Sequence, residues 1–274
     1  MSSDLSSLRL APGEPVSPER AGWSFLSFAV HEVSAPLSVG GPGIETAVVV
    51  LAGGGVRVGD LELPGRASVW EGLPSAAYLP PGFVAEVLPV GEFVTVAVTN
   101  APASGRETAS VPVRIGPEDV VTEVRGAGNA TRQINHIIAP DFPADRLEVV
   151  EVYTPSGNWS SWPPHKHDTD DMPREAVLEE VYSYRFRRPD AWAVQRLYRA
   201  DGSRDLLWAV RDGETVIVTD GYHPFVATHG NDAYYLNALA GEHRTMACSF
   251  HPALDWVRDE WESMEPDPRV PLVR

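Results

Sequence analysis

The sequence is poor in cysteine and in long apolar runs. Its one cysteine, Cys248, excludes an intramolecular disulfide, which fits a reducing compartment. Residues 1–12 are polar and lack the apolar core of a signal peptide. The longest apolar runs, such as residues 47–52, are too short to cross a bilayer. We therefore expect a cytoplasmic protein with no membrane partner.

Basic charge is also scarce. Lys and Arg number 22 against 38 Asp and Glu, so the net charge of the 274-residue chain is −16. A surface this acidic argues against nucleic acid or an anionic membrane as a partner. An anionic substrate would need a locally positive site here, such as a metal ion or a focused arginine.

Helical patterns are few, and short strand-like segments recur between turns rich in Gly and Pro. This spacing is typical of a β-sandwich or barrel, and the length suits two of them in tandem. We predict an all-β chain with an N-terminal barrel over residues 1–125 and a C-terminal barrel over residues 126–274. Residues 253–261 are expected to form a short helix, and residues 168–178 to contain one turn.

Two histidines separated by one residue, His165 and His167, give the strongest chemical signal. Alternate residues of a strand share a face, so both imidazoles can point the same way. Glu180 and His223 follow on later strand-like segments. Imidazoles and a carboxylate together form a typical shell for a divalent transition metal, with positions left open for substrate oxygen.

Close competitors exist for two of these residues. Glu179 adjoins Glu180, but the parity that turns Tyr182 inward selects Glu180. His229 lies in a sequence typical of an exposed turn, which makes it a weaker third imidazole than His223. Two further carboxylates, those of Glu148 and Glu151, lie on the strand-like segment before the histidine pair and could supply a second acidic group.

Several stretches resemble the cupins and, more narrowly, the 5-deoxy-glucuronate isomerase family of myo-inositol catabolism. They are EVYTPSGNWSSWPPHKHD (151–168), LEEVYSYRF (178–186), DGYHP (220–224), YYLNALAG (234–241) and WEGLPSAAYLPPG (70–82). The resemblance implies a bicupin fold similar to that of the 4-deoxy-5-hexosulose-uronate ketol-isomerases. It also implies a metal shell of His165, His167, Glu180 and His223. The N-terminal half has no histidine between His31 and His136, so its barrel is expected to carry no equivalent site.

The implied reaction is a metal-dependent aldose–ketose isomerisation of 5-deoxy-D-glucuronate to 5-dehydro-2-deoxy-D-gluconate. One divalent ion would serve it, zinc by analogy with the related isomerases, with manganese or iron as alternatives. The catalytic candidates are Glu180, Glu151 and Tyr182. The candidates for binding the substrate are Lys166, Arg196 and Tyr222.

Two other functions are compatible with the same residues. A cupin-type Fe(II) dioxygenase would need the same ligands and consume oxygen, and a non-enzymatic sugar-binding bicupin would show no turnover. The expected partner is a small deoxy-uronate. A homodimer or a higher homo-oligomer is also expected, because exposed sheet edges favour self-association.

Overall fold

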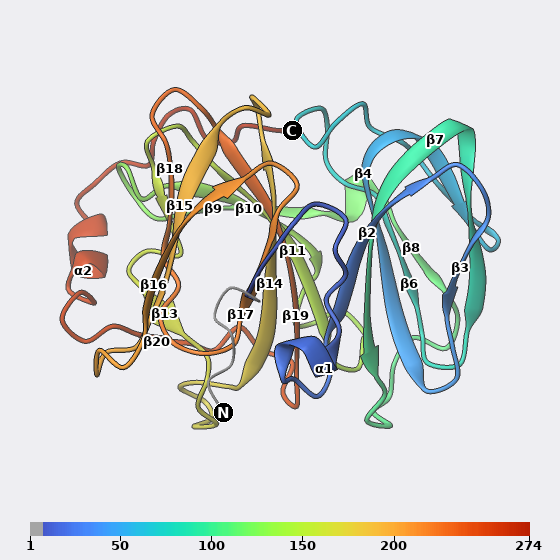
Figure 1. Cartoon of the computed structure of the whole chain (residues 1–274), viewed down its shortest axis with the longest axis horizontal. Helices are drawn as coiled ribbons and strands as arrows, with labels where there is room; N and C mark the ends of the chain where they lie inside the picture. The colour runs from blue at the N-terminus through green and yellow to red at the C-terminus, as the bar shows by residue number, and fades with distance from the viewer. Residues whose placement is uncertain (1–7) are drawn as a thin grey trace.

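The computed structural model describes residues 8–274, whose strands form two β-barrels side by side (Figure 1). The all-β tandem-barrel prediction is confirmed. The helices of the described residues are short: α1 (Pro18–Ala21), the 3-10 helix η2 (Pro117–Asp119) and α2 (Val257–Trp261). The last of these lies within the predicted C-terminal helix. None of these helices has the length or the hydropathy to cross a membrane.

One antiparallel sheet forms the N-terminal barrel, in the order β2-β7-β4-β6-β8, with β3 paired to β7 and β5 to β4. Its strands are β2 (Ser27–Val33), β3 (Leu37–Gly40), β4 (Ile44–Val58), β5 (Leu61–Leu63), β6 (Ala76–Leu79), β7 (Val84–Pro102) and β8 (Val113–Ile115). The two long strands, β4 and β7, bend where their register shifts at the Gly53–Gly55 segment. A Cβ atom on Gly54 would lie 2.4 Å from the carbonyl oxygen of Val90, so the close approach of the strands requires glycine.

Alternation along β4 divides its side chains between two cores. Val48 and Val50 point into the N-terminal barrel, where buried aliphatic side chains fill the interior. Val49 and Leu51 point the other way and join a larger core that continues into the C-terminal barrel. Because both faces of β4 are buried, the barrels pack through an apolar interface.

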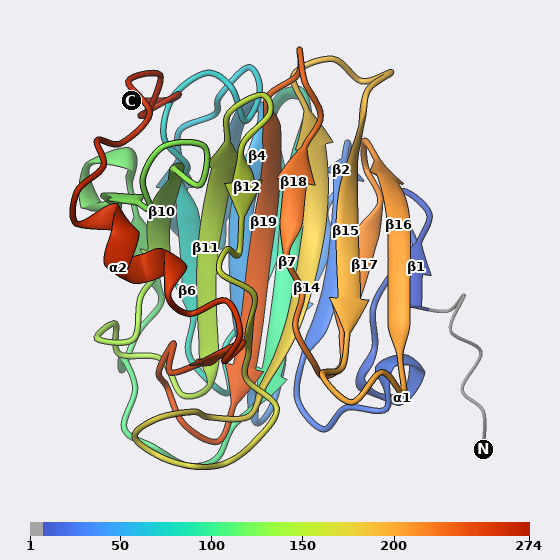
Figure 2. The ribbon, with the colours of Figure 1, turned by 90° about the vertical axis from the view of Figure 1, so that its left-hand side faces the viewer.

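The C-terminal barrel has a large sheet in the order β1-β17-β14-β19-β11-β10-β9 and a smaller one in the order β12-β18-β15-β16. The large sheet contains β1 (Arg9–Leu10), β9 (Val121–Arg125), β10 (Arg132–Ile138), β11 (Leu147–Thr154), β14 (Leu178–Phe186), β17 (Thr215–Val218) and β19 (Ala233–Gly241). The smaller sheet contains β12 (Trp159–Ser160), β15 (Trp192–Tyr198), β16 (Asp205–Arg211) and β18 (Phe225–Ala227), and a separate pair joins β13 (His165–Lys166) to β20 (Ser249–Phe250). Figure 2 looks onto this barrel, with α2 (red) on the side nearest the viewer.

Strand pairing crosses the boundary expected between residues 125 and 126. β9 pairs with β10, and β1, near the start of the described chain, pairs with β17. Residues 171–175 form the single expected turn between the histidine pair and β14, closed by a 3.2 Å hydrogen bond from the backbone N–H of Glu175 to the carbonyl of Asp171. The division into two folding domains and the self-association of the chain stay predictions.

Two buried carboxylates, those of Glu45 and Glu179, each accept hydrogen bonds from the backbone of the other half of the chain. Glu45 of the N-terminal barrel accepts hydrogen bonds from three backbone N–H groups at the start of β11, those of residues 145–147. Glu179 of the C-terminal barrel accepts three from residues 24–26, at 2.6 to 2.9 Å. Each carboxylate thus has charge-assisted partners in the other half, which compensates its burial.

Candidate metal centre and active site

A cavity of about 790 Å³ opens into the C-terminal barrel. Its inner wall is the large sheet, where alternate residues of β10, β11, β14 and β19 point inward. Residues from β13, β20 and the segment around α2 form the rest of the wall. The lining includes Arg132, Ile134, Val150, Val152, Ser161, Trp162, His165, His167, Glu180, Tyr182, Tyr235, Asn237, Phe250, Arg258 and Trp261.

Three buried side chains converge beside this cavity, and two of them, His167 and Glu180, line it. One possible ligand atom from each of His167, Glu180 and His223 lies within 4.8 Å of the other two. His167 Nε2 is 2.9 Å from Glu180 Oε2, and His223 Nε2 is 3.4 Å from the same oxygen. Within residues 8–274, this is the group of His, Cys, Asp or Glu side chains close enough to hold a metal ion.

The far nitrogen of each imidazole is fixed by the backbone. His167 Nδ1 donates to the carbonyl oxygen of Leu178 at 2.9 Å, and His223 Nδ1 donates to that of Gly221 at 3.0 Å. These contacts give each Nδ1–H a carbonyl acceptor and direct each Nε2 toward Glu180, as in histidines that bind metals. His223 Nε2 is fully buried without a hydrogen-bond partner among the described residues. A buried nitrogen acceptor without a hydrogen-bond partner, next to a carboxylate, fits a ligand of a metal ion.

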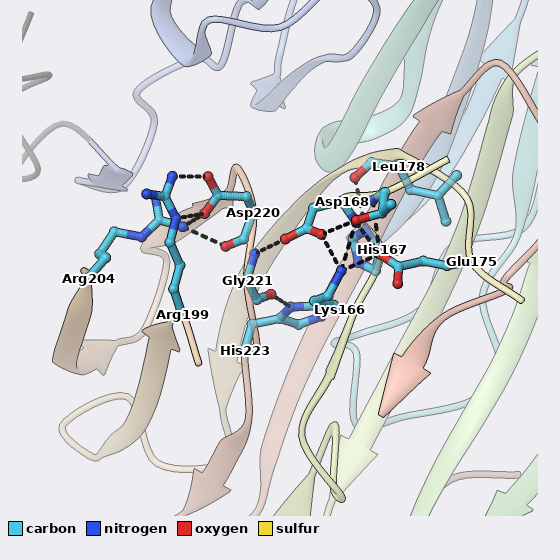
Figure 3. A network of polar contacts seen from close by, with 11 residues as sticks. Lys166, His167, Asp168, Glu175, Leu178, Arg199, Arg204, Asp220, Gly221 and His223 are labelled. Carbon is cyan, nitrogen blue, oxygen red and sulfur yellow. Dashed lines mark hydrogen bonds and ion pairs between the residues drawn. The ribbon is translucent and has the colours of Figure 1, made fainter. Parts of the chain in front are cut away.

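A polar network supports this geometry (Figure 3). Asp168 accepts a 2.8 Å hydrogen bond from the backbone N–H of Gly221. Lys166 reaches back to Asp168 and also to Glu175, whose carboxylate is 2.8 Å from the ammonium. The residue after the histidine pair therefore anchors the turn that carries His223, which couples the segments of His167 and His223.

His165 lies beside the cluster rather than in it. Its ring packs edge-on against that of His223, with 4.7 Å between centroids, and lines the cavity. Burial, and then the neighbouring His223 and His167, lower its pKa well below the ordinary 6.5. The ring is consequently neutral at neutral pH, the form that can bind a metal.

The pKa values of the other two histidines shift in opposite directions, because burial and Glu180 compete at each ring. Burial lowers the pKa of His223 to about 4, although Glu180 offsets part of the effect. Burial also disfavours protonated His167, but the hydrogen bond and charge of Glu180 outweigh it and raise the pKa. His223 is therefore a ready lone-pair donor, whereas Glu180 favours the protonated form of His167.

Hydroxyl groups line the side of the cluster. Tyr182 Oη lies 2.9 Å from Ser161 Oγ, and the Tyr182 ring is 5.9 Å from that of His223. Burial, followed by the charge of Glu180, raises the pKa of Tyr182 well above 10. Tyr182 is thus a neutral phenol that can donate a hydrogen bond, not a phenolate base.

Glu151 lies on the opposite face of β11 from the cavity. Its neighbours Val150 and Val152 line the cavity, while the Glu151 carboxylate forms a buried 2.9 Å ion pair with Arg66 of the N-terminal barrel. Asn135 donates to it as well, at 2.9 Å. The structure therefore assigns Glu151 to the interface between barrels, out of reach of a bound substrate.

The three predicted substrate-binding residues do not line the cavity. Lys166 is engaged by Asp168 and Glu175, as its outward parity suggests. Arg196 pairs on the outer surface with Asp205 at 2.8 Å, because its neighbour Gln195 takes the inward position. Tyr222 packs against other aromatic rings behind the cluster.

Sequence reasoning missed the cavity wall formed by β10 and the α2 segment. Arg132 and Ile134 point into the cavity, while Gln133 between them points toward the other barrel and bonds Asn135. A strand buried on both faces shows no clear polar alternation, which hides such residues. The α2 segment contributes Trp261, which has no recognisable signal before the fold is known.

Comparison with known proteins points to one family. The model of the KduI/IolB family matches residues 10–257. The 5-deoxy-glucuronate isomerase of Geobacillus kaustophilus (strain HTA426) is 39% identical over 251 residues, which cover 89% of this chain and 90% of that protein. The protein of the same name from Listeria monocytogenes is 34% identical over 262 residues, covering 91% and 94% respectively.

Solved structures agree on the fold. A crystal structure of an IolB-like protein from Salmonella typhimurium LT2 superposes with a TM-score of 0.84 at 33% identity and covers 90% of this chain and 96% of that one. The oxalate decarboxylase of Lactobacillus farciminis, solved as a formate complex, gives a TM-score of 0.60 at 10% identity, with 89% and 88% covered. This second likeness concerns the fold alone.

Proposed function

Since the chain belongs to the KduI/IolB family, we propose that it is a metal-dependent isomerase that converts 5-deoxy-D-glucuronate into 5-dehydro-2-deoxy-D-gluconate. The observation that carries the metal dependence is the buried group of His167, Glu180 and His223, with the orphaned Nε2 of His223. The names of the relatives support the substrate, and the myo-inositol pathway follows from it.

One divalent ion is proposed to bind to His167, Glu180 and His223. The imidazole of His165, which packs against that of His223, would be a fourth ligand. The donor set of neutral imidazole and carboxylate fits zinc, and manganese or iron as alternatives. When bound there, the ion would act as a Lewis acid that polarises the aldehyde carbonyl and acidifies the neighbouring C–H.

The isomerisation needs no external oxidant. The hydrogen on C2 of the sugar ends on C1, and the hydroxyl proton on O2 ends on O1. We assign the movement of the oxygen-bound proton to the hydroxyl pair of Tyr182 and Ser161, because each can both donate and accept a hydrogen bond. We assign to Trp162, Phe250 and Trp261, which line the cavity, the role of limiting the access of bulk water to the reacting carbons.

Elemental analysis of the purified protein, combined with an isomerase assay before and after chelation, tests this proposal. The expected result is about one metal ion per chain and turnover that chelation abolishes and readdition of one metal restores. Metal-loaded protein that consumes oxygen with candidate sugars would point to a dioxygenase. Metal-loaded protein without any turnover would point to a sugar-binding role.

A further inference from the structure

The cavity beside His167, Glu180 and His223 is lined by four arginines, one of which lacks a paired carboxylate. Three of the four guanidinium groups pair with a neighbouring carboxylate: Arg125 with Glu123 at 2.7 Å, Arg174 with Asp171 at 2.6 Å and Arg258 with Asp255 at 3.2 Å. The fourth, Arg132, has no carboxylate within 4.0 Å among residues 8–274. It is also the buried one, at 5% exposure.

Among residues 8–274, one nitrogen of Arg132 has hydrogen-bond partners. Its first terminal nitrogen donates to the carbonyl oxygens of Ala130 at 3.2 Å and Trp162 at 3.1 Å. Within the part of the chain that is described, its Nε and second terminal nitrogen have no partner. A forked pair of donors on the wall of a cavity matches the two oxygens of a carboxylate.

The guanidinium remains charged although it is desolvated. Burial lowers the pKa of Arg132 to about 10, so the group is a cation at neutral pH. A buried cation without a counter-ion is costly, and this cost falls when an anion enters the cavity. In a chain of net charge −16, this is the focused positive site that an anionic substrate needs.

Arg132 lines the same cavity as His167 and Glu180. The positive charge of Arg132 contributes to the lowered pKa of His165, and the hydroxyls of Tyr182 and Tyr235 lie within its field. On β9 the charges of Glu123 and Arg125 pair with each other. Toward the α2 segment, Asp255 pairs with Arg258, which leaves the carboxylates of Asp259 and Glu262 in excess. An anion is therefore repelled from the α2 side and attracted to Arg132.

We propose that Arg132 binds the carboxylate of the uronate substrate and so directs the carbonyl at the other end of the sugar toward His167, Glu180 and His223. This inference rests on the proposed function. Arg132 takes the role that sequence reasoning gave to Lys166 or Arg196, both of which are held by acidic neighbours outside the cavity.

The test compares Arg132→Gln, Arg132→Lys and the control Arg174→Gln, which removes a cavity arginine that is 78% exposed and already paired. Each metal-loaded variant is assayed for kcat and KM on 5-deoxy-D-glucuronate. Each is also titrated calorimetrically with D-glucuronate and with neutral D-glucose. Metal content and thermal melting are recorded for every variant.

Loss of a charged, forked hydrogen bond predicts a KM and a glucuronate Kd higher by about 10- to 100-fold in Arg132→Gln. Arg132→Lys should recover part of this loss, because it keeps the charge without the fork. Arg174→Gln should change either constant by less than about 3-fold. Metal content should stay at the wild-type level in all three variants.

Two results would overturn the inference. One is wild-type protein that binds glucuronate no better than glucose. The other is glucuronate affinity that is unchanged in both Arg132 variants. Failure of the proposed function looks different, because metal-loaded wild-type protein would then show no turnover, while the glucuronate titrations would still decide the role of Arg132.

Discussion

The carbonyl oxygen of Gly221 accepts a 3.0 Å hydrogen bond from His223 Nδ1, so the turn before the histidine orients its own ring. The same glycine donates its N–H to Asp168, one residue beyond His167. Gly221 has φ +81°, a conformation that favours glycine, and a Cβ atom there would lie 2.5 Å from the carbonyl oxygen of Tyr198. The arrangement of His167, Glu180 and His223 therefore depends on Gly221, which contributes no side chain to it.

Gly221→Ala should consequently weaken metal binding. The collision with Tyr198 moves the turn, which frees His223 from its backbone anchor, and loss of such support typically costs about 10- to 100-fold in metal affinity. Competition titration with a chromogenic chelator measures this change. The matched control is Gly230→Ala, at φ +89° with no atom within 4 Å of the new Cβ. Equal metal affinity in the two variants would show that the turn does not position the ligand.

Glu179 and Glu180, adjacent residues of β14, allow a second comparison, between loss of metal and loss of stability. Glu180→Gln should remove most of the bound metal and the turnover, because an amide replaces the charged oxygen that faces His167 and His223. Glu179→Gln should keep the metal and lose about 1–3 kcal/mol of unfolding free energy, since three backbone N–H groups lose a charged acceptor. Metal content and urea unfolding separate the two effects. The reverse pattern would place the ligand on the other face of β14.

The opposite orientations of Glu179 and Glu180 could be predicted from the sequence. The alternation of β14 places Glu180 and Tyr182 on one face and Glu179 on the other, and the structure has them so. Strand parity is a strong constraint because a shift of one residue would move every side chain to the opposite face. The His-x-His spacing likewise brings both rings to one wall of the cavity, although the closest ligand atoms come from His167.

The same reasoning fails on β11 and β10. Every residue of β11 is buried, so its pattern cannot distinguish the cavity face from the face against the N-terminal barrel. Glu151 therefore looked available for catalysis, although Arg66, 85 residues earlier in the sequence, neutralises it. The β10 pattern does not single out Arg132 for the corresponding reason, since only the three-dimensional fold reveals that it has no acidic partner among residues 8–274.

Glu151→Gln tests whether Glu151 stabilises the interface between the barrels through Arg66 and takes no part in catalysis. Removal of one partner leaves the buried Arg66 charge uncompensated, which should lower the unfolding free energy by about 3–5 kcal/mol. Below the melting transition, the kcat of the folded variant should stay within a few-fold of wild type. The double variant Arg66→Met with Glu151→Gln should be less destabilised than the sum of the two single variants. A kcat lowered by orders of magnitude in folded Glu151→Gln would return this residue to catalysis.

Glu148 gives the expected pH dependence of stability. Its side chain is 1% exposed, and neither carboxyl oxygen has a hydrogen-bond partner among the described residues. Burial raises the pKa of Glu148 from 4.5 to about 7, although Arg244 opposes the shift. Between these two pH values the native state keeps a proton that the unfolded state releases. The contribution of Glu148 to the unfolding free energy should therefore fall as pH rises from 4.5 to 7, by at most about 3 kcal/mol.

Glu148→Gln removes this titration, because the amide stays neutral at every pH. The variant should gain stability relative to wild type as pH rises through the same window, and the gain should level off above pH 7. Urea unfolding of the chelated protein at several pH values measures the difference. The control is Glu107→Gln, which replaces a surface carboxylate and should leave the pH profile unchanged. If the profiles of Glu148→Gln and wild type run parallel from pH 4.5 to 7, the carboxyl group does not hold its proton in the folded protein.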